Sequence, residues 1–151
     1  MTYTIRPVKL TDEARWVEML NAYAMFYKTS VPEGGHACVW DWIFDPSNDF
    51  WCDLIIDVNG KAVGFTQYQL MHRSLSGEMV CYLSDLFVEP GLRGSGYGRA
   101  LIDHVIEFAK ARKISNVRWL TQDYNYAGRR LYDTYAPKSD FILYSVPIKA
   151  D

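Results

Sequence analysis

The fold is decided by residues 82–99, which read YLSDLFVEPGLRGSGYGR. The first half is an apolar run typical of a buried strand. A helical pattern begins just after the stretch, with Leu101, Val105 and Ala109 on one side. A glycine-rich turn, residues 93–98, joins the two. Backbone N–H groups and the positive end of the helix dipole converge at such a turn, so this order of elements favours binding of a phosphate group.

The residue types in the turn support the same interpretation. Gly94, Gly96 and Gly98 let the main chain approach an anion without a Cβ in the way, while Arg93 and Arg99 add positive charge. The turn differs from the two commonest nucleotide loops, because Arg99 stands where G-x-G-x-x-G needs its last glycine and no G-K-[S/T] follows. A tight structural turn remains the alternative.

The composition limits the classes of protein in which such a turn can occur. The chain has 151 residues, 49% of them hydrophobic and 23% charged, which predicts one globular domain over residues 1–151. With 16 basic and 18 acidic side chains there is no global positive field, so we expect neither nucleic acid nor a membrane as partner. Three cysteines without C-x-x-C spacing predict reduced thiols, no metal site and a cytoplasmic protein.

Working outward from the turn, the periodicity alternates between strand and helix. Strands are predicted at residues 3–8, 53–58, 62–71, 79–88, 117–122 and 141–146. Helices are predicted at residues 11–28, 37–44 and 125–135, and after the glycine-rich turn around Leu101, Val105 and Ala109. Thr11 is expected to cap the first helix, and Asn59-Gly60 to form a tight hairpin turn. The pattern predicts an α/β fold with a mixed central sheet flanked by helices.

Charge is unevenly spread along this pattern. Residues 29–60 hold six acids and no Lys or Arg, whereas residues 89–130 hold eight bases against four acids. Ordinary solvated faces would account for both. The functional alternative is a site with two sides, which takes a cationic ligand near the acidic segment and an anionic one near the basic segment.

Two motifs in the expected order resemble the GNAT superfamily of N-acetyltransferases. Residues 93–98 match its R/Q-x-x-G-x-G/A loop, and residues 125–132 resemble N-x-x-A-x-x-L-Y, with Gly128 at the usual Ala. The resemblance implies a GNAT fold with acetyl-coenzyme A as co-substrate, lying in the cleft beside the strand that precedes the loop. It assigns cofactor binding to Leu86, Phe87, Val88, Arg93, Gly94, Ser95, Gly96, Tyr97, Gly98, Arg99 and Asn125.

The resemblance extends over most of the chain. Residues 23–32, 82–88, 119–122 and 131–133 are similar to the group that contains yeast histone and polyamine acetyltransferases. One departure concerns the base: the more distant spermidine/spermine enzymes commonly show Tyr-Leu-Glu-Asp, whereas residues 82–85 here read Tyr-Leu-Ser-Asp. The glutamate usually credited with general-base work is therefore replaced by Ser84.

The chemistry requires a base and an acid. An alkyl amine is neutral in only about one molecule in 10³ at pH 7, so a proton must leave before nitrogen attacks the thioester. Asp85 is a candidate to accept that proton or to bind the acceptor, although strand alternation predicts that it faces away from Ser84 and Leu86. Ser84 could hold a relaying water. The resemblance assigns Tyr132 as the acid that protonates the leaving thiolate.

The acceptor pocket is expected on the first two helices and the first hairpin. Candidate substrate-binding residues are Tyr23, Tyr27, Glu33, Trp40 and Asp41, with core packing as the alternative for each aromatic one. A polyamine or another small cationic amine is the preferred acceptor, and we expect it to attack the acetyl group directly in a ternary complex. A protein lysine or an aminoglycoside is the alternative acceptor. A non-catalytic acyl-coenzyme A binding module and an unrelated phosphate-binding α/β domain also remain open. The aromatic content and the resemblance favour a homodimer.

Overall fold

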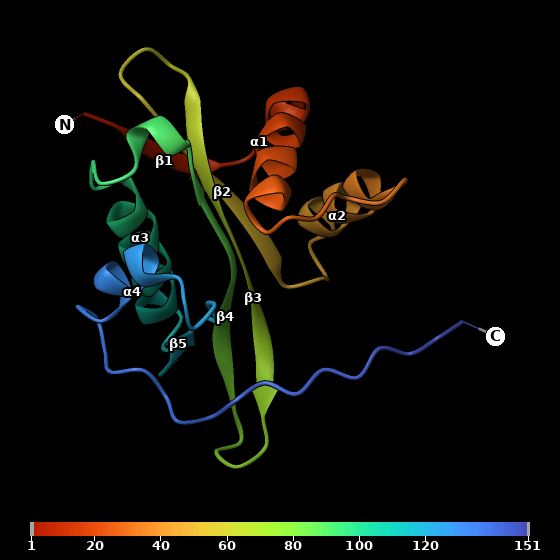
Figure 1. The fold of residues 1–151 in the computed structure, drawn as a ribbon, viewed down its shortest axis with the longest axis vertical. Helices are drawn as coiled ribbons and strands as arrows, with labels where there is room; N and C mark the ends of the chain where they lie inside the picture. Colours follow the sequence, from red (N-terminus) through yellow and green to blue (C-terminus); the bar gives the residue numbers. More distant parts are fainter. Residues whose placement is uncertain (1, 151) are drawn as a thin grey trace. The chain divides into compact units, whose positions relative to one another are not determined.

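The computed structural model describes residues 2–150, which divide into two compact units, residues 1–120 and 121–151. The first unit contains a five-stranded sheet with strand order β1-β2-β3-β4-β5. The first four strands pair antiparallel, whereas β4 and β5 pair in parallel. The predicted α/β class with a mixed sheet and flanking helices is confirmed (Figure 1).

The elements of the first unit follow the predicted order. Their bounds are β1 Thr4–Pro7, α1 Glu13–Phe26, α2 Gly35–Phe44, β2 Phe50–Ile56, β3 Ala62–Arg73, β4 Glu78–Val88, α3 Tyr97–Ala111 and β5 Val117–Arg118. Short 3-10 turns, Leu10–Asp12 and Pro90–Leu92, precede α1 and the glycine-rich turn.

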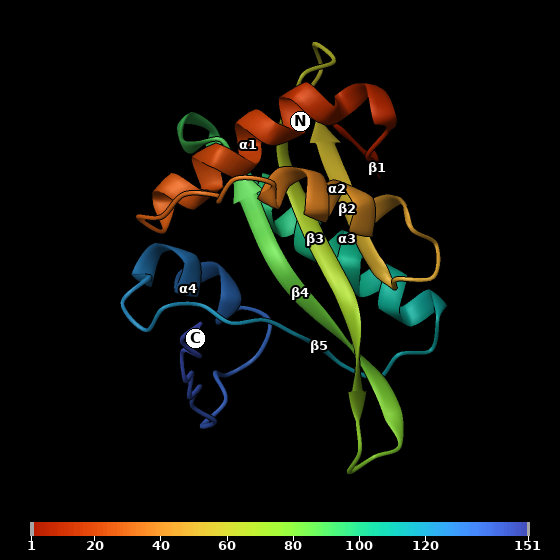
Figure 2. The same cartoon turned by 90° about the vertical axis from the view of Figure 1, so that its right-hand side faces the viewer.

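The helices cover opposite faces of the sheet (Figure 2). On one face α1 and α2 bury Trp16, Leu20 and Trp40 against Leu54 and Phe65 of the strands. On the other face Tyr97 and Leu101 of α3 pack against Ile55 and Val63. Because side chains alternate along each strand, the central strands supply both cores and carry few exposed residues.

Two local predictions were wrong in detail. Thr11 does not cap α1, because it lies inside the 3-10 turn and the helix begins after Asp12. Asp12 is instead held by Arg6 at 2.8 Å. The hairpin turn is present at Asn59-Gly60, but only Gly60 has a positive φ, and the Asp57 side chain holds the turn by accepting from the N–H groups of Asn59 and Lys61. An Asx-type turn therefore replaces the expected two-residue turn.

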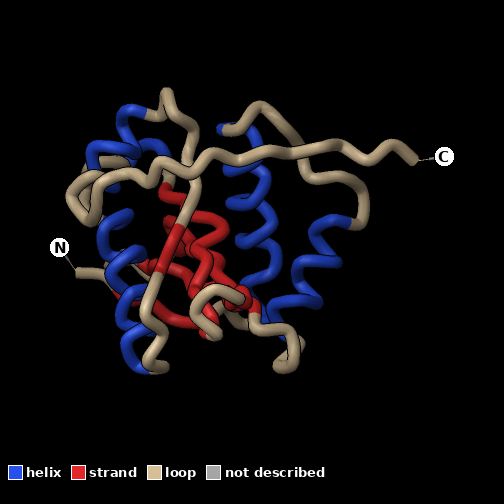
Figure 3. The backbone as a smooth tube through the Cα atoms, turned by 90° about the horizontal axis from the view of Figure 1, so that it is seen from below, coloured by secondary structure: helices blue, strands red, loops and turns tan. Residues whose placement is uncertain are grey.

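The second unit is less regular than predicted. Its helix α4 spans Tyr126–Tyr132, within the predicted residues 125–135. Residues 141–146, predicted to be a strand, form none and are drawn as loop in Figure 3. In the first unit, β5 likewise pairs over two residues rather than the predicted six. A strand needs a partner along its length, and neither segment has one in this structure.

Candidate active site

A β-bulge in β4 is the centre of the candidate site. Gln67 of β3 pairs with Asp85, but its neighbour Tyr68 pairs with Leu83, so Ser84 lies opposite no residue. Gln67 Nε2 donates to Asp85 Oδ2 at 2.7 Å, and Gln69 Nε2 donates to Ser84 Oγ at 2.9 Å. Gln67 and Gln69 are alternate residues of one strand and share a face. The expectation that Ser84 and Asp85 face apart was wrong, because the extra residue changes the phase of the alternation.

Asp85 is fixed by a chain of buried hydrogen bonds. Trp16 Nε1 of α1 donates to Gln67 Oε1 at 2.9 Å, which orients the amide so that its Nε2 donates to Asp85. Trp16 is fully buried and Gln67 is 2% exposed. Burial raises the pKa of the Asp85 carboxyl, and hydrogen bonds from Gln67 and Tyr23 offset only part of that rise. Asp85 is thus a stronger base than an ordinary aspartate.

The predicted acceptor residues separate into two groups. Tyr23 hydrogen-bonds Asp85 and Tyr27, and burial followed by the Asp85 charge raises the pKa of its phenol, so it stays protonated. Trp40 is 8% exposed and packs in the core against Trp16, with ring centroids 4.9 Å apart. These contacts favour core packing, the alternative for this residue, over substrate binding. Glu33 and Asp41 are exposed.

The glycine-rich turn leads into α3 as predicted. Gly94 and Gly96 have φ of +81° and +93°, and a Cβ built on either would meet no atom within 4 Å. The turn therefore needs glycine for its backbone conformation and leaves open space above it. The first helical bond beyond it runs from Ala100 N to Gly96 O, so the N–H groups of the first turn have no helical partner. This arrangement is suited to an anion.

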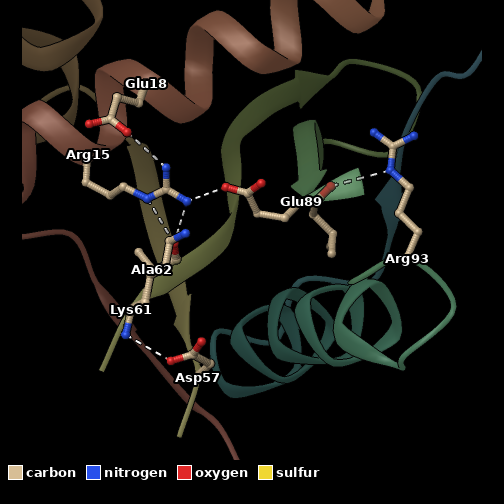
Figure 4. Close-up of polar contacts among 8 residues, drawn as sticks. Arg15, Glu18, Asp57, Lys61, Ala62, Glu89 and Arg93 are labelled. Carbon is tan, nitrogen blue, oxygen red and sulfur yellow. Dashed lines mark hydrogen bonds and ion pairs between the residues drawn. The ribbon is translucent and has the colours of Figure 1, made fainter. Parts of the chain in front are cut away.

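Arg15 of α1 anchors the strand end that leads into the turn (Figure 4). Its Nε and Nη2 donate to the carbonyl oxygen of Ala62 at 3.0 and 2.9 Å, and Nη2 also pairs with Glu89, the residue after β4. Arg93 is held separately: its guanidinium lies over the ring of Phe26, 4.7 Å from the centroid, and its Nε donates to Val88 O at 3.4 Å.

Among the described residues, no strand pairs with one edge of β4 beyond the bulge. The parallel pairing with β5 involves only Cys81 and Tyr82, and it ends before Ser84. Along residues 85–88 the other edge is paired with β3. Phe87 is 2% exposed and belongs to the core, so this segment can offer a ligand its backbone groups rather than the Phe87 side chain.

The remaining predicted residues lie in the second unit. Asn125 is the N-cap of α4, where its Oδ1 accepts from Gly128 N at 3.3 Å and its Nδ2 donates to Thr121 Oγ1 at 2.9 Å. A Cβ on Gly128 would lie 2.5 Å from Asn125 Nδ2, so alanine at this position would require the Asn125 side chain to shift. Tyr132 is the last residue of α4 and is partly buried.

The comparison with known families decides between the interpretations. The model of the acetyltransferase (GNAT) family matches residues 16–135, which include the bulge, the turn and α4. The chain belongs to the GNAT acetyltransferase family. It is therefore an acetyl-coenzyme A dependent N-acetyltransferase rather than an unrelated phosphate-binding domain, because GNAT enzymes use acetyl-coenzyme A as the acetyl donor.

Individual relatives support the assignment. The D-amino-acid N-acetyltransferase HPA3 of Saccharomyces cerevisiae is 32% identical over 141 residues, covering 93% of this chain and 88% of that protein. The N-acetyltransferase YhfO of Bacillus subtilis is 29% identical over 97% of this chain and 98% of its own length. The structure of AAC(6')-Iy with a coenzyme A bisubstrate analogue shares the GNAT fold, with a TM-score of 0.82, 16% identity and coverage of 99% and 100%.

Two further observations concern other site types. Within residues 2–150, no group of three or more His, Cys, Asp or Glu side chains is arranged to hold a metal ion. None of the helices in the described part of the chain combines the length and apolarity that a membrane span requires. Cys52 and Cys81 are buried and Cys38 is exposed, all as free thiols.

Sequence reasoning missed the residues that support the site. Gln67, Trp16, Arg15 and Phe26 act by holding Asp85, Glu89 and Arg93. A glutamine inside an apolar strand was the one available signal, because a buried amide needs partners for both of its ends. Arg15 gave none, since it occupies an ordinary polar position of an amphipathic helix.

Proposed function

We propose that this GNAT enzyme transfers the acetyl group to a primary amine of a small cationic molecule, preferably a polyamine, and that Asp85 takes the proton from the amine. The observation that carries the proposal is the partly buried Asp85 carboxylate with a raised pKa, fixed at a bulge beside the unpaired edge of β4. The direction of the pKa shift matters, because a base whose pKa lies nearer neutrality accepts an amine proton more readily.

In the proposed reaction the amine attacks the thioester carbonyl directly. The C–N bond forms, the C–S bond breaks, and the amine proton passes to Asp85, either directly or through a water held by Ser84. Gln69 donates to Ser84 Oγ, so the Ser84 hydroxyl proton is left to bind such a water. Because Gln67 and Tyr23 both donate to Asp85, the carboxylate is oriented before the acceptor arrives.

Residues of the turn would hold the pyrophosphate of acetyl-coenzyme A. The open space at Gly94 and Gly96 and the N-terminus of α3 fit an anion, with Arg93, Ser95, Tyr97, Gly98 and Arg99 around them. The edge of Leu86, Phe87 and Val88 that does not pair with β3 would pair with the pantetheine arm. The family motif also assigns cofactor binding to Asn125. When bound, the cofactor supplies an activated acetyl group.

Tyr132 is proposed as the acid that protonates the leaving thiolate. The support is its place in the second motif and the chemistry of a phenol, which is mostly protonated at neutral pH. Tyr132→Phe should lower kcat about 10²-fold or more while the affinity for coenzyme A changes little. Tyr144→Phe, an exposed tyrosine of the same unit, is the matched control and should leave kcat unchanged.

The preferred acceptor follows from charge. Tyr23 contacts Asp85, and Tyr27 packs against Tyr23. The exposed acids Glu33 and Asp41 belong to a segment without Lys or Arg, which would attract a polycation. A second candidate is the amine of a free amino acid, which is favoured by the 32% identical D-amino-acid N-acetyltransferase and by a thialysine N-epsilon-acetyltransferase of Sus scrofa, 33% identical over 72 residues.

An acceptor panel tests both parts of the proposal. Spermidine, lysine, thialysine, several D-amino acids and an aminoglycoside are compared by release of coenzyme A. We expect the highest kcat/KM with spermidine; a higher value with an amino acid would replace the polyamine by the second candidate. Asp85→Asn should lower kcat about 10²-fold to 10⁴-fold, whereas the exposed Asp49→Asn should not. An Asp85→Asn enzyme with normal kcat and a raised KM would make Asp85 an acceptor-binding residue.

We also propose a homodimer, and the second unit offers the support. Its last segment exposes large apolar side chains, with exposed fractions of 91% for Phe141, 84% for Tyr144 and 88% for Ile148. Large apolar side chains exposed close together in sequence favour an interaction surface. Sedimentation analysis of the full chain and of a chain truncated after Lys138 tests it: a dimer that becomes a monomer on truncation supports the proposal, and a monomeric full chain refutes it.

A further inference from the structure

A cavity away from Asp85 is lined by residues of β2, β3, α2 and α3. Its volume is about 570 Å³, within the range of small-molecule sites. Asp53 of β2 pairs with Thr66, and Asp85 of β4 pairs with the next residue, Gln67. Successive side chains of a strand point to opposite faces, so the two carboxylates belong to different faces of the sheet. The α3 residues His104 and Phe108 line the cavity at Asp53.

Three aromatic rings form one wall of this cavity. Trp51, Tyr68 and Phe108 are in mutual contact, with ring centroids 5.7 Å apart for Trp51 and Tyr68 and 4.9 Å for each ring with Phe108. The guanidinium of Arg112 lies over Trp51 at 4.9 Å and over Phe108 at 4.7 Å. Arg112 does not line the cavity, so the ring surfaces that it covers lie outside the cavity. These rings therefore already bind one cation.

A buried carboxylate, that of Asp53, lies among these aromatic and apolar side chains. Asp53 is 4% exposed, and its Oδ2 accepts from both the Tyr68 hydroxyl and His104 Nε2, the latter at 2.9 Å. Both contacts end on Oδ2, which leaves Oδ1 for a further donor. Burial and then the Asp53 charge raise the pKa of Tyr68, so the phenol stays protonated and keeps donating. A carboxylate buried among apolar groups is costly unless charge and donors compensate it.

The lining carries two acids, Asp53 and Glu107, and no Lys or Arg. Its one histidine, His104, is already paired with Asp53 Oδ2. Anionic ligands are therefore disfavoured. An ammonium ion would gain both the Asp53 charge and the faces of the aromatic rings, and an apolar group attached to it would fill the rest of the cavity.

We propose that this cavity, built by Asp53, Glu107 and the rings of Trp51, Tyr68 and Phe108, is a second binding site that takes an organic ammonium ion with an apolar body. Its buried carboxylate, Asp53, belongs to the face of the sheet opposite Asp85, and its occupancy does not depend on acetyl transfer. An ammonium ligand there would contact β2, β3, α2 and α3, and α3 is the helix that follows the glycine-rich turn.

The test uses benzyltrimethylammonium, which has no N–H and no lone pair and cannot be acetylated. It is titrated into the full chain and followed by the indole N–H signal of Trp51, identified by its loss in Trp51→Phe. We expect a saturable shift that benzyl alcohol, the neutral probe, does not produce. Asp53→Asn should weaken binding about tenfold or more, and Glu107→Gln about twofold to fivefold. Asp85→Asn and the exposed Glu13→Gln should leave it unchanged.

The outcomes separate this site from the acetyltransferase site. No saturable Trp51 shift at millimolar probe, equal binding of benzyl alcohol, or loss of binding in Asp85→Asn would overturn the proposal. Circular dichroism checks that Asp53→Asn is folded. If Asp53→Asn is not folded, Glu107→Gln becomes the deciding variant. Glu107 is an exposed helix residue whose ion pair is with the exposed Lys110, so this variant should fold. Weakened binding in Glu107→Gln but not in Glu13→Gln then supports the site, and unchanged binding refutes it.

Discussion

Replacing Arg15 by methionine should separate α1 from the strand end that leads into the glycine-rich turn. Methionine keeps the apolar stem and removes the charge and every donor. The lost contacts are the two bonds to the Ala62 carbonyl, at 3.0 and 2.9 Å, and the pair with Glu89. The contact with Glu18 is a surface pair, since Glu18 is 68% exposed, and we assign it no contribution.

The magnitude follows from these contacts. The pair with Glu89 is partly exposed, at 25% and 31%, so solvent screening limits it to about 0.5–1 kcal/mol. The charged donors on one backbone carbonyl add about 1–1.5 kcal/mol. The free energy of unfolding should therefore fall by about 2 kcal/mol, and Tm by about 4–8 °C for a chain of this size. Because Glu89 immediately precedes the turn, KM for acetyl-coenzyme A should rise more than kcat falls.

Urea denaturation and steady-state kinetics are the assays. Arg15→Lys is the conservative variant; it retains the charge without the planar fork and should recover part of the stability and of the KM. Arg73→Met, at the exposed end of β3, is the matched control and should change the free energy of unfolding by less than about 0.5 kcal/mol. A loss below about 0.5 kcal/mol in Arg15→Met, or an unchanged KM, would show that Arg15 does not hold the turn.

Three further predictions concern the sheet and its charges. A Cβ at Gly64 would lie 2.4 Å from the Phe87 carbonyl oxygen, so Gly64→Ala should cost about 2–3 kcal/mol in urea denaturation, while Gly91→Ala, where a Cβ meets nothing, should cost almost none. Arg6 holds the pKa of Asp12 below its usual range, so this pair stabilises the fold above about pH 4, and its contribution disappears as pH falls through the lowered pKa. Asp12→Asn should therefore be less stable than wild type at pH 7 but not at pH 2. An equal loss of stability at both pH values would contradict this linkage. Gln67→Leu removes a hydrogen bond that lowers the pKa of Asp85, so the acidic limb of the kcat/KM profile should move to higher pH, and a shift to lower pH would exclude Asp85 as its source.

The sequence predicted the order of the elements and the glycine-rich turn better than it predicted the side-chain geometry around them. Period-two and helical patterns placed β2 to α3 within a few residues, and Gly94 and Gly96 do have the positive φ that such a turn needs. The alternation rule failed at Ser84, because a bulge leaves no mark in the residue types. The burial of Trp40 could not be predicted, because an aromatic residue of a helix looks the same in sequence whether it faces a pocket or a core. Arg15 and Phe26 were missed because long-range contacts do not follow from local pattern.

The bulge at Ser84 has a consequence for how β4 tolerates change. Residues on both sides of it already pair with consecutive positions of β3, Gln67 with Asp85 and Tyr68 with Leu83. Removing residue 84 would therefore leave every other β3 partner in place and yield an ordinary, unbroken ladder. The bend depends on the number of residues in β4 rather than on which side chain occupies position 84. Substitutions there, including serine for the glutamate of related enzymes, preserve the shape of the strand, whereas a one-residue deletion would straighten it within an otherwise intact sheet.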